Sequence, residues 1–162
     1  MLLPKEILIM LVSMVPVGEV DFGVILSRVF GMPIEAGIFW SVFGNMIPIL
    51  LIMWLLEPVS NWLMKHWPFF KKIFTRILEH THKRHSKNME RIGEVFIAIF
   101  IAIPFPGTGA YTAALLCYLF NIPYWKSILS IFVGTLAAAF ILAYGIEGGA
   151  HVPDLLAPFI TK

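Results

Sequence analysis

Two stretches of this chain are long enough and apolar enough to cross a lipid bilayer as helices. Residues 36–56 form a run of 21 without a charged side chain, and residues 127–146 form a second run of 20. At a rise of about 1.5 Å per residue, each helix reaches roughly 30 Å, the thickness of the hydrocarbon core. We therefore predict two transmembrane helices in an all-α membrane protein.

The composition excludes most other classes of protein. Hydrophobic residues make up 59% of the 162 residues and charged residues only 14%, and the mean hydropathy is +0.84. A water-soluble chain of this size needs more charged surface, so soluble enzymes, disordered tails and nucleic-acid-binding proteins are excluded. The single cysteine, Cys117, excludes an internal disulfide and a cysteine-based zinc site, and we interpret it as a packing residue.

Enzyme motifs and a cleavable signal sequence are not recognisable. The chain has no His-Glu-x-x-His, no Gly-x-Ser-x-Gly and no Walker lysine loop, so we expect no catalytic residue, cofactor or metal site. The apolar stretch after Lys5 is followed by Glu19 rather than by a small-residue cleavage site, so we expect the N-terminal segment to remain. His80, His82 and His85 stand among lysines and arginines, which favours a solvated surface over a metal site.

Two further apolar stretches are interrupted. Residues 7–18 are uncharged and end at Pro16 and Gly18, and residues 95–125 are uncharged but contain two prolines and two glycines within 104–109. Proline removes a backbone donor and glycine weakens a helix, so we expect two short helical arms around each break. Arms of about 8–12 residues span roughly half a bilayer. We therefore predict two re-entrant hairpins, whose irregular backbone is shielded by protein or lines a cavity.

The chain also contains a weak internal repeat with an offset of 90 residues. The matched residues are prolines, glycines and apolar positions: Pro16 and Pro106, Leu26 and Leu116, Phe30 and Phe120, Pro33 and Pro123, Ile38 and Ile128, and Gly44 and Gly134. The next position is polar and small in both copies, Asn45 and Thr135, and either packs helices together or lines a pathway. Each copy is then a hairpin, a proline-led turn and a spanning helix, at about 6–56 and 94–146.

Basic residues are concentrated between the two copies. Residues 57–94 hold eight of the twelve Lys and Arg and four of the five His, and positively charged loops stay in the cytoplasm. We therefore predict a cytoplasmic connector of amphipathic helices at 57–93, and a short tail at 147–162. The two spanning helices then run in opposite directions. The copies form an inverted repeat whose hairpins meet near the midplane, an arrangement typical of transporters.

Ionisable residues inside membrane segments mark a pathway or a proton site. Glu19 and Asp21 follow the first break, and Arg28 lies two helical turns beyond Asp21. A desolvated carboxyl group in this position can exchange a proton for a cation. In a shallow hairpin, the same groups would instead meet interfacial water.

The second break is the most specific motif of the chain. It consists of Pro104, Pro106, Gly107, Thr108 and Gly109. Glycines let the backbone approach a ligand closely, amides at the start of a half-helix bind anions, and freed carbonyls can coordinate a cation. The alternative is a tight turn without a ligand, and the repeat favours the functional interpretation.

The segment 103–112, Ile-Pro-Phe-Pro-Gly-Thr-Gly-Ala-Tyr-Thr, resembles the small multidrug export protein family. Gly-Asn-x-x-Pro at 44–48 and Pro-x-x-Glu-x-x-x-Gly at 16–23 belong to the same resemblance, which covers about 14–147 and implies that Tyr111 and Thr112 line the pathway. The family is similar to the DedA/VTT membrane proteins, which share paired re-entrant hairpins. Its members commonly have an arginine two residues after the glutamate. Here that position is Asp21, so the family's Glu–Arg pairing carries over only if Arg28 substitutes.

The resemblance implies a multi-pass protein of the bacterial or archaeal cytoplasmic membrane that exports drugs or translocates lipids. We favour a proton-coupled secondary transporter of small cationic or amphipathic compounds, with Glu19 as the coupling carboxylate. The alternatives are a lipid flippase or scramblase, whose basic connector would recruit anionic headgroups, and a structural partner without transport activity. Because two spans and two hairpins enclose little volume, we expect a homodimer surrounded by membrane lipids.

Overall fold

The computed structural model describes residues 4–16, 18–68, 87–103, 109–120 and 122–148. Within these ranges the chain is helical and contains no β-strand. The helices in chain order are α1 (Lys5–Ser13), α2 (Glu19–Val29), α3 (Ile34–His66), α5 (Lys87–Ala102), α6 (Ala110–Leu119) and α7 (Tyr124–Glu147). The predicted all-α fold is confirmed.

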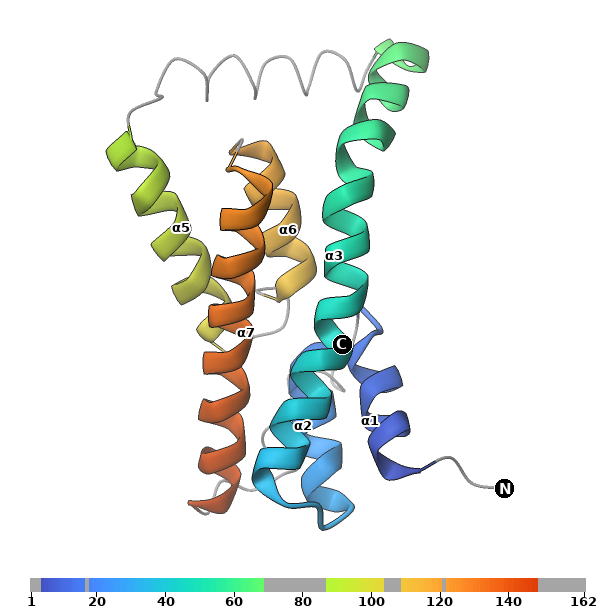
Figure 1. Cartoon of the computed structure of the whole chain (residues 1–162), viewed down its shortest axis with the longest axis vertical. Coiled ribbons are helices and arrows are strands. Elements are labelled where there is room, and N and C mark those ends of the chain that lie inside the picture. The colour runs from blue at the N-terminus through green and yellow to red at the C-terminus, as the bar shows by residue number, and fades with distance from the viewer. Residues whose placement is uncertain (1–3, 17, 69–86, 104–108, 121, 149–162) are drawn as a thin grey trace.

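Among the described helices, α3 and α7 are the two that are long and apolar enough to cross a membrane. They contain 33 and 24 residues and pack against each other in opposite directions, as Figure 1 shows. Both predicted spanning helices are present. α3 is longer than predicted, because it continues past residue 56 and through Pro58 to His66. Hydropathy marks the part of a helix suited to lipid, and the helix itself continues into a more polar region.

The four short helices form two pairs at opposite ends of the long ones. α1 and α2 pack on the lower part of α3, and α5 and α6 stand at the upper end beside α7 (Figure 1). The chain leaves helical geometry after Ser13 and again after Ala102, near the prolines and glycines that predict the breaks. We call α1 to α3 the first half of the molecule and α5 to α7 the second half.

One glycine in each long helix lets a short helix cross closely. A Cβ added at Gly44 of α3 would lie 2.3 Å from the carbonyl oxygen of Met10 in α1. A Cβ added at Gly134 of α7 would lie 2.7 Å from the carbonyl oxygen of Ala98 in α5. Small residues allow such close approach between membrane helices. Gly44 and Gly134 are also a pair matched by the 90-residue offset, so both halves have the same type of crossing.

The turns that lead into the two long helices are alike as well. Pro33 precedes α3 with φ −55° and ψ 143°, and Pro123 precedes α7 with φ −54° and ψ 140°. In each turn an amide donates to the carbonyl five residues earlier, from Met32 to Ser27 at 3.0 Å and from Ile122 to Cys117 at 2.9 Å. Proline suits this position because its fixed φ and missing N–H are tolerated at the start of a helix. The offset therefore matches residues with the same backbone geometry.

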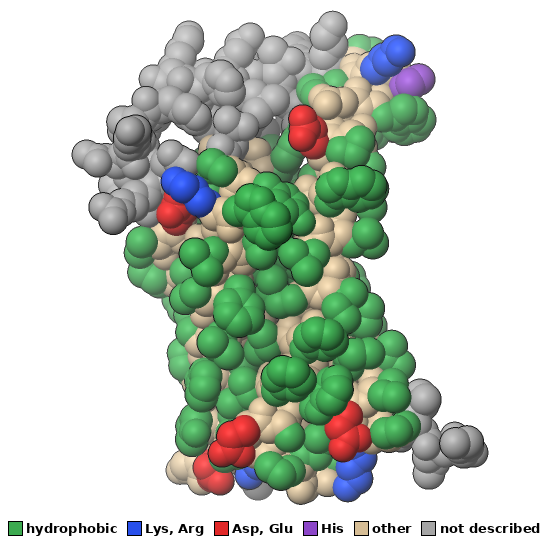
Figure 2. Space-filling model, in the orientation of Figure 1, with side chains coloured by type: hydrophobic (Ala, Val, Ile, Leu, Met, Phe, Trp, Pro, Cys, Tyr) green, Lys and Arg blue, Asp and Glu red, His purple; other side chains and the backbone are tan. Residues whose placement is uncertain are grey.

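The buried apolar residues form two clusters. The lower cluster joins α2 to the first part of α3 and the last part of α7: Val20, Val24, Ile38, Val42, Ala138, Ala139, Leu142 and Ala143. The upper cluster joins the middle of α3 to α5, α6 and the first part of α7: Ile49, Met53, Ile97, Ile101, Ala110, Ala113, Ala114, Cys117, Ile122 and Ile131. On the surface, Figure 2 shows a hydrophobic band between two ends that carry the acidic and basic side chains. Such a band suits contact with lipid.

The predicted connector at 57–93 does not begin or end at a helix boundary. Its first ten residues, 57–66, continue α3, and its last seven, 87–93, belong to α5. Residues 69–86, which include His80, His82 and His85, lie outside the described residues. The first part of the predicted connector, as far as His66, is therefore the end of α3 and not a separate helix.

Candidate functional site

The inner ends of the two short-helix pairs are joined by the side chain of Glu19. Glu19 is the first residue of α2, and its Oε2 accepts a hydrogen bond of 2.9 Å from the backbone N–H of Ala110, the first residue of α6. The amides at a helix N-terminus and its partial positive charge stabilise an anion. The carboxyl group therefore lies at the first turns of two helices, one from each half of the molecule. We call this contact the Glu19 junction.

Gly109 provides the space for this carboxyl group. A Cβ added at Gly109 would lie 1.6 Å from Oε2 of Glu19 and 2.1 Å from its Cδ. Gly109 has a φ of −76°, which any residue can adopt, so the glycine is required by the close approach and not by the backbone conformation. Under the 90-residue offset, Gly109 is the counterpart of Glu19. One half of the molecule contributes the side chain and the other half leaves room for it.

A second hydrogen bond links the two halves at the same place. The hydroxyl of Tyr111, in the first turn of α6, donates to the carbonyl of Met14, which directly follows α1. Asp21 is half-buried on α2, two residues beyond Glu19. Of the predicted pathway residues, Glu19, Gly109 and Tyr111 are therefore brought together from the two halves.

The backbone of Glu19 adopts an uncommon conformation. Its φ is 46°, in the left-handed region that favours glycine and costs other residues about 1–3 kcal/mol. Such conformations persist where surrounding contacts fix the residue, and they gather at functional sites. The bond to Ala110 and the packing of α2 are contacts of this kind.

Asn45 and Thr135 lie at the level of the Glu19 junction. On α3, Asn45 follows Val42 of the lower cluster and precedes Ile49 of the upper cluster. Thr135 on α7 is likewise bounded by the two clusters, and the bond between Glu19 and α6 also crosses from one cluster to the other. The predicted polar residues on α3 and α7 thus both lie between the two apolar clusters.

Several polar atoms in this region are buried without a hydrogen-bond partner. They are the side-chain oxygen and nitrogen of Asn45 and the hydroxyls of Ser13, Ser41 and Thr135, and all four side chains are 0% exposed. An unpaired buried donor or acceptor costs about 1–3 kcal/mol. Native proteins satisfy such groups with ordered water or a bound ligand. The interior therefore has hydrogen-bonding capacity that the protein itself does not use.

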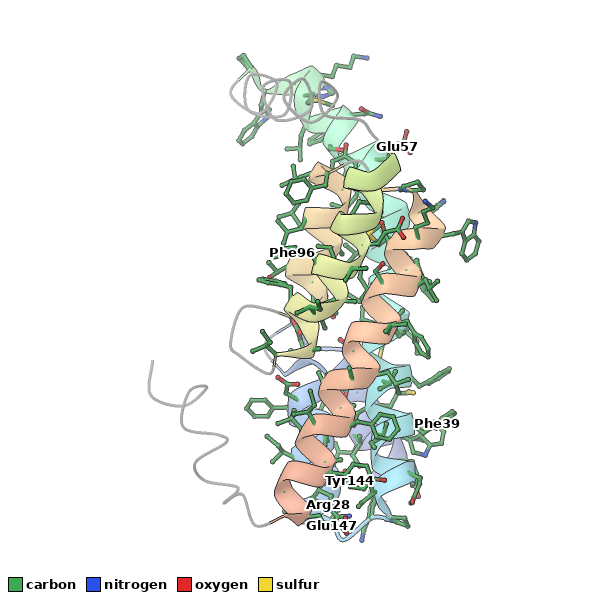
Figure 3. The ribbon with its side chains drawn as sticks, turned by 90° about the vertical axis from the view of Figure 1, so that its left-hand side faces the viewer. Arg28, Phe39, Glu57, Phe96, Tyr144 and Glu147 are labelled. Carbon is green, nitrogen blue, oxygen red and sulfur yellow. The ribbon has the colours of Figure 1, made fainter. Side chains whose placement is uncertain are left out.

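Arg28 is the predicted site residue that lies away from the junction. Its Nη2 is 3.7 Å from Oε1 of Glu147, and its Nη1 donates to the carbonyl of Met32 at 2.9 Å. Figure 3 shows Arg28 and Glu147 together at the lower end of the molecule. Arg28 therefore does not substitute for the arginine that the family pairs with this glutamate. Because Arg28 belongs to the last turn of α2, it meets the end of α7, and a backbone amide takes its place beside Glu19.

The remaining predicted residues are only partly described. Thr112 is exposed on α6. Pro104, Pro106, Gly107 and Thr108 lie outside the described residues, so Gly109 is the member of that motif whose surroundings are seen.

The sequence prediction missed Ser13 and Ser41, which both face Gly23 of α2. A Cβ added at Gly23 would lie 1.9 Å from Oγ of Ser13 and 2.6 Å from Oγ of Ser41. A signal was present, because Gly37, Ser41 and Asn45 follow one another at intervals of four and share one face of α3. Serine is also a common packing residue between membrane helices, so the spacing does not distinguish the two roles.

The apolar band, the two long helices and the half-buried carboxyl group of Glu19 define a helical membrane protein. The sequence model of a protein family described as "Putative small multi-drug export protein" matches residues 19–141. The chain belongs to this family, and the match runs from Glu19 through α6 into α7, so that it includes both sides of the Glu19 junction. No match was found among curated proteins or among solved structures.

Proposed function

We propose that this protein is a proton-coupled secondary transporter that exports small organic cations. The observation that supports this proposal most directly is the hydrogen bond from the Ala110 amide to Glu19 across the two halves. A carboxylate in this position attracts a cation, and the same group cannot hold a proton and balance a cation at once. Protonation also removes the charge that strengthens its bond to the amide. Proton binding and the contact between the halves are therefore coupled.

We further propose that each half is a re-entrant helix pair followed by a spanning helix, and that the halves form an inverted repeat. The opposite directions of α3 and α7, the matched crossings at Gly44 and Gly134, and the matched turns at Pro33 and Pro123 support this arrangement. If the basic connector lies in the cytoplasm, α1 and α2 enter from outside and α5 and α6 enter from the cytoplasm. The Glu19 junction is then near the midplane, where secondary transporters bind their substrates.

The transporter is proposed to act as a homodimer in a bacterial or archaeal cytoplasmic membrane. The described helices include only two that can span a bilayer, so one chain supplies little protein around the junction. α5 turns Val95, Phe96 and Ile99 outward, and Figure 3 shows Phe96 on this outer face. Crosslinking in native membranes is expected to give a dimer, and a purely monomeric product would contradict this part of the proposal.

The central test uses purified protein in vesicles that contain a pH-sensitive dye. Lipophilic cations and anions are added to wild type, to Glu19→Gln and to Glu35→Gln, which changes an exposed carboxylate in the first turn of α3. We expect cation-dependent proton movement in wild type and in the Glu35 variant, and none in Glu19→Gln. Glutamine keeps an acceptor for the Ala110 amide but cannot carry a proton. If no compound moves protons, coupled transport is wrong, and labelled lipids in the same vesicles would then test lipid translocation.

A further inference from the structure

The contact between α2 and α3 is lined by small and polar residues in regular register. A Cβ added at Gly37 would lie 2.2 Å from Oγ of Ser27, and one at Gly23 would lie 2.6 Å from Oγ of Ser41. The two helices are antiparallel (Figure 1), so four residues back along α2 correspond to four residues forward along α3. The next pair in this register is Glu19 and Asn45. We call this row, together with the facing hydroxyl of Ser13, the α2–α3 seam.

The hydroxyls of the seam do not all serve helix packing. Ser27 shows how a packing serine behaves, because its hydroxyl donates to the carbonyl of Val24 in its own helix at 2.7 Å. Ser13 and Ser41 are equally buried, yet neither hydroxyl has a partner. Both side-chain polar atoms of Asn45 are also unpaired. Alanine or glycine would pack as closely without burying unpaired groups, so the seam has the chemistry of a site that binds water.

We infer that the α2–α3 seam is hydrated and carries protons between Glu19 and the end of the molecule where α2 turns into α3. Ordered water satisfies buried polar groups of this kind. Along a water file, each molecule accepts a proton on one side and gives one up on the other, so one proton leaves Glu19 and one reaches the turn. The proton role rests on the function proposed above, and the hydration of the seam does not.

The corresponding row in the second half is only partly polar. The 90-residue offset matches Ser13 to Ile103, Gly23 to Ala113, Ser27 to Cys117 and Ser41 to Ile131, whereas Gly37 and Asn45 are matched to Ser127 and Thr135. Ala113, Cys117 and Ile131 belong to the upper apolar cluster. Because the unpaired hydroxyls of Ser13 and Ser41 have isoleucines as counterparts, we place the pathway in the first half, where it connects Glu19 with the side of the membrane opposite to the connector.

Hydration of the seam can be measured with thiol chemistry, and the chain contains its own control. Cys117 is a free, buried cysteine in the apolar counterpart of the seam. We expect Ser41→Cys in a Cys117→Ala background to react with a small water-soluble thiol reagent at least about tenfold faster than Cys117 in wild type, because reaction needs access to water and a thiolate. Ser13→Cys provides a second reporter if Ser41→Cys does not fold. Equal, slow reaction at both seam positions would show that the seam is dry and overturn the inference.

The proton role is tested in the dye-loaded vesicles with Ser13→Ala and Ser41→Ala. Both changes keep the Cβ and remove an unpaired hydroxyl, so stability should not fall, whereas proton movement should fall about tenfold. Ser130→Ala on α7, a buried serine outside the seam, should leave it unchanged. Full proton movement in both seam variants, with none in Glu19→Gln, would overturn the pathway and leave the proposed function standing. Full movement in Glu19→Gln as well would overturn both.

Discussion

The two halves of the molecule share a backbone arrangement and differ in the chemistry that they bury. Both have a glycine crossing, a proline-led turn and a short helix packed on a long one. The first half buries Ser13, Ser41 and Asn45 without hydrogen-bond partners, while the second half has Ile103, Ile131 and Thr135 at the matched positions. The backbone arrangement is therefore common to both halves, and among the described residues the unpaired serine hydroxyls belong to the first half. A shared backbone arrangement with different buried side chains allows the two halves to have different roles.

The strongest way to break the contact between the halves is to fill the space at Gly109. In Gly109→Ala the new Cβ would occupy the position of the Glu19 carboxyl group. The carboxyl group is the far end of a flexible side chain and can move aside, so the expected cost is that of the lost charge-assisted hydrogen bond, about 1.5–3 kcal/mol in the free energy of unfolding, together with a loss of transport. Thermal unfolding in detergent measures the first effect.

The matched control is Gly145→Ala, because a Cβ at Gly145 of α7 meets nothing within 4 Å. It should leave the midpoint temperature unchanged or raise it, since alanine favours a helix. Equal midpoint temperatures for the Gly109 and Gly145 variants would contradict the geometry of the Glu19 junction.

Gly44→Ala and Gly134→Ala test whether the helix crossings in the two halves are equivalent. Each new Cβ meets a backbone carbonyl of the crossing helix, at 2.3 Å and 2.7 Å. Backbone yields less easily than a side chain, so we expect each change to cost about 1–3 kcal/mol of unfolding free energy. Chemical denaturation in mixed micelles would compare them. A large cost at one glycine and none at the other would show that the halves are not equivalent at this crossing.

The role of the unpaired buried groups is tested by replacing each with an apolar side chain of similar shape. Asn45→Leu and Thr135→Val replace unpaired buried groups by apolar ones. We expect each to raise the free energy of unfolding by about 1 kcal/mol, because no partner is lost. Asn45→Leu should also reduce proton movement, since Asn45 extends the seam. A fall in stability at Asn45 would instead indicate that its amide has a partner in the folded protein.

The smallest effects are expected at the ends of the molecule. Arg28 and Glu147 are 3.7 Å apart at the lower end, and Lys126 and Glu94 are 3.0 Å apart at the upper end. Both pairs reach solvent, so each should contribute less than about 1 kcal/mol, and less still at high salt. Double-mutant cycles at two salt concentrations measure this. A coupling above that value at either end would mean that the pair is shielded from water in the membrane.

Much of this arrangement could be predicted from sequence, and the limits have physical causes. Prolines and glycines end helices locally, so the breaks and the proline-led turns were predictable. Glu19 stood out because a carboxylate in an apolar segment is costly. The partner of Glu19 could not be predicted, because it is a backbone amide 91 residues away, and every non-proline residue has one. The partner of Arg28 could not be predicted either, because Glu147 belongs to a helix that is distant in the sequence.

The Glu19 junction also has a consequence for the order in which the protein assembles. The first turn of α6 has no capping side chain of its own, because Gly109 precedes it, and the acceptor for its first amide comes from α2. Within a bilayer, an amide without an acceptor is costly. During synthesis the first half is made before α6, so the first half can already be folded when α6 is synthesised. The second half then completes its short helix only by docking, which makes the first half a template for the second.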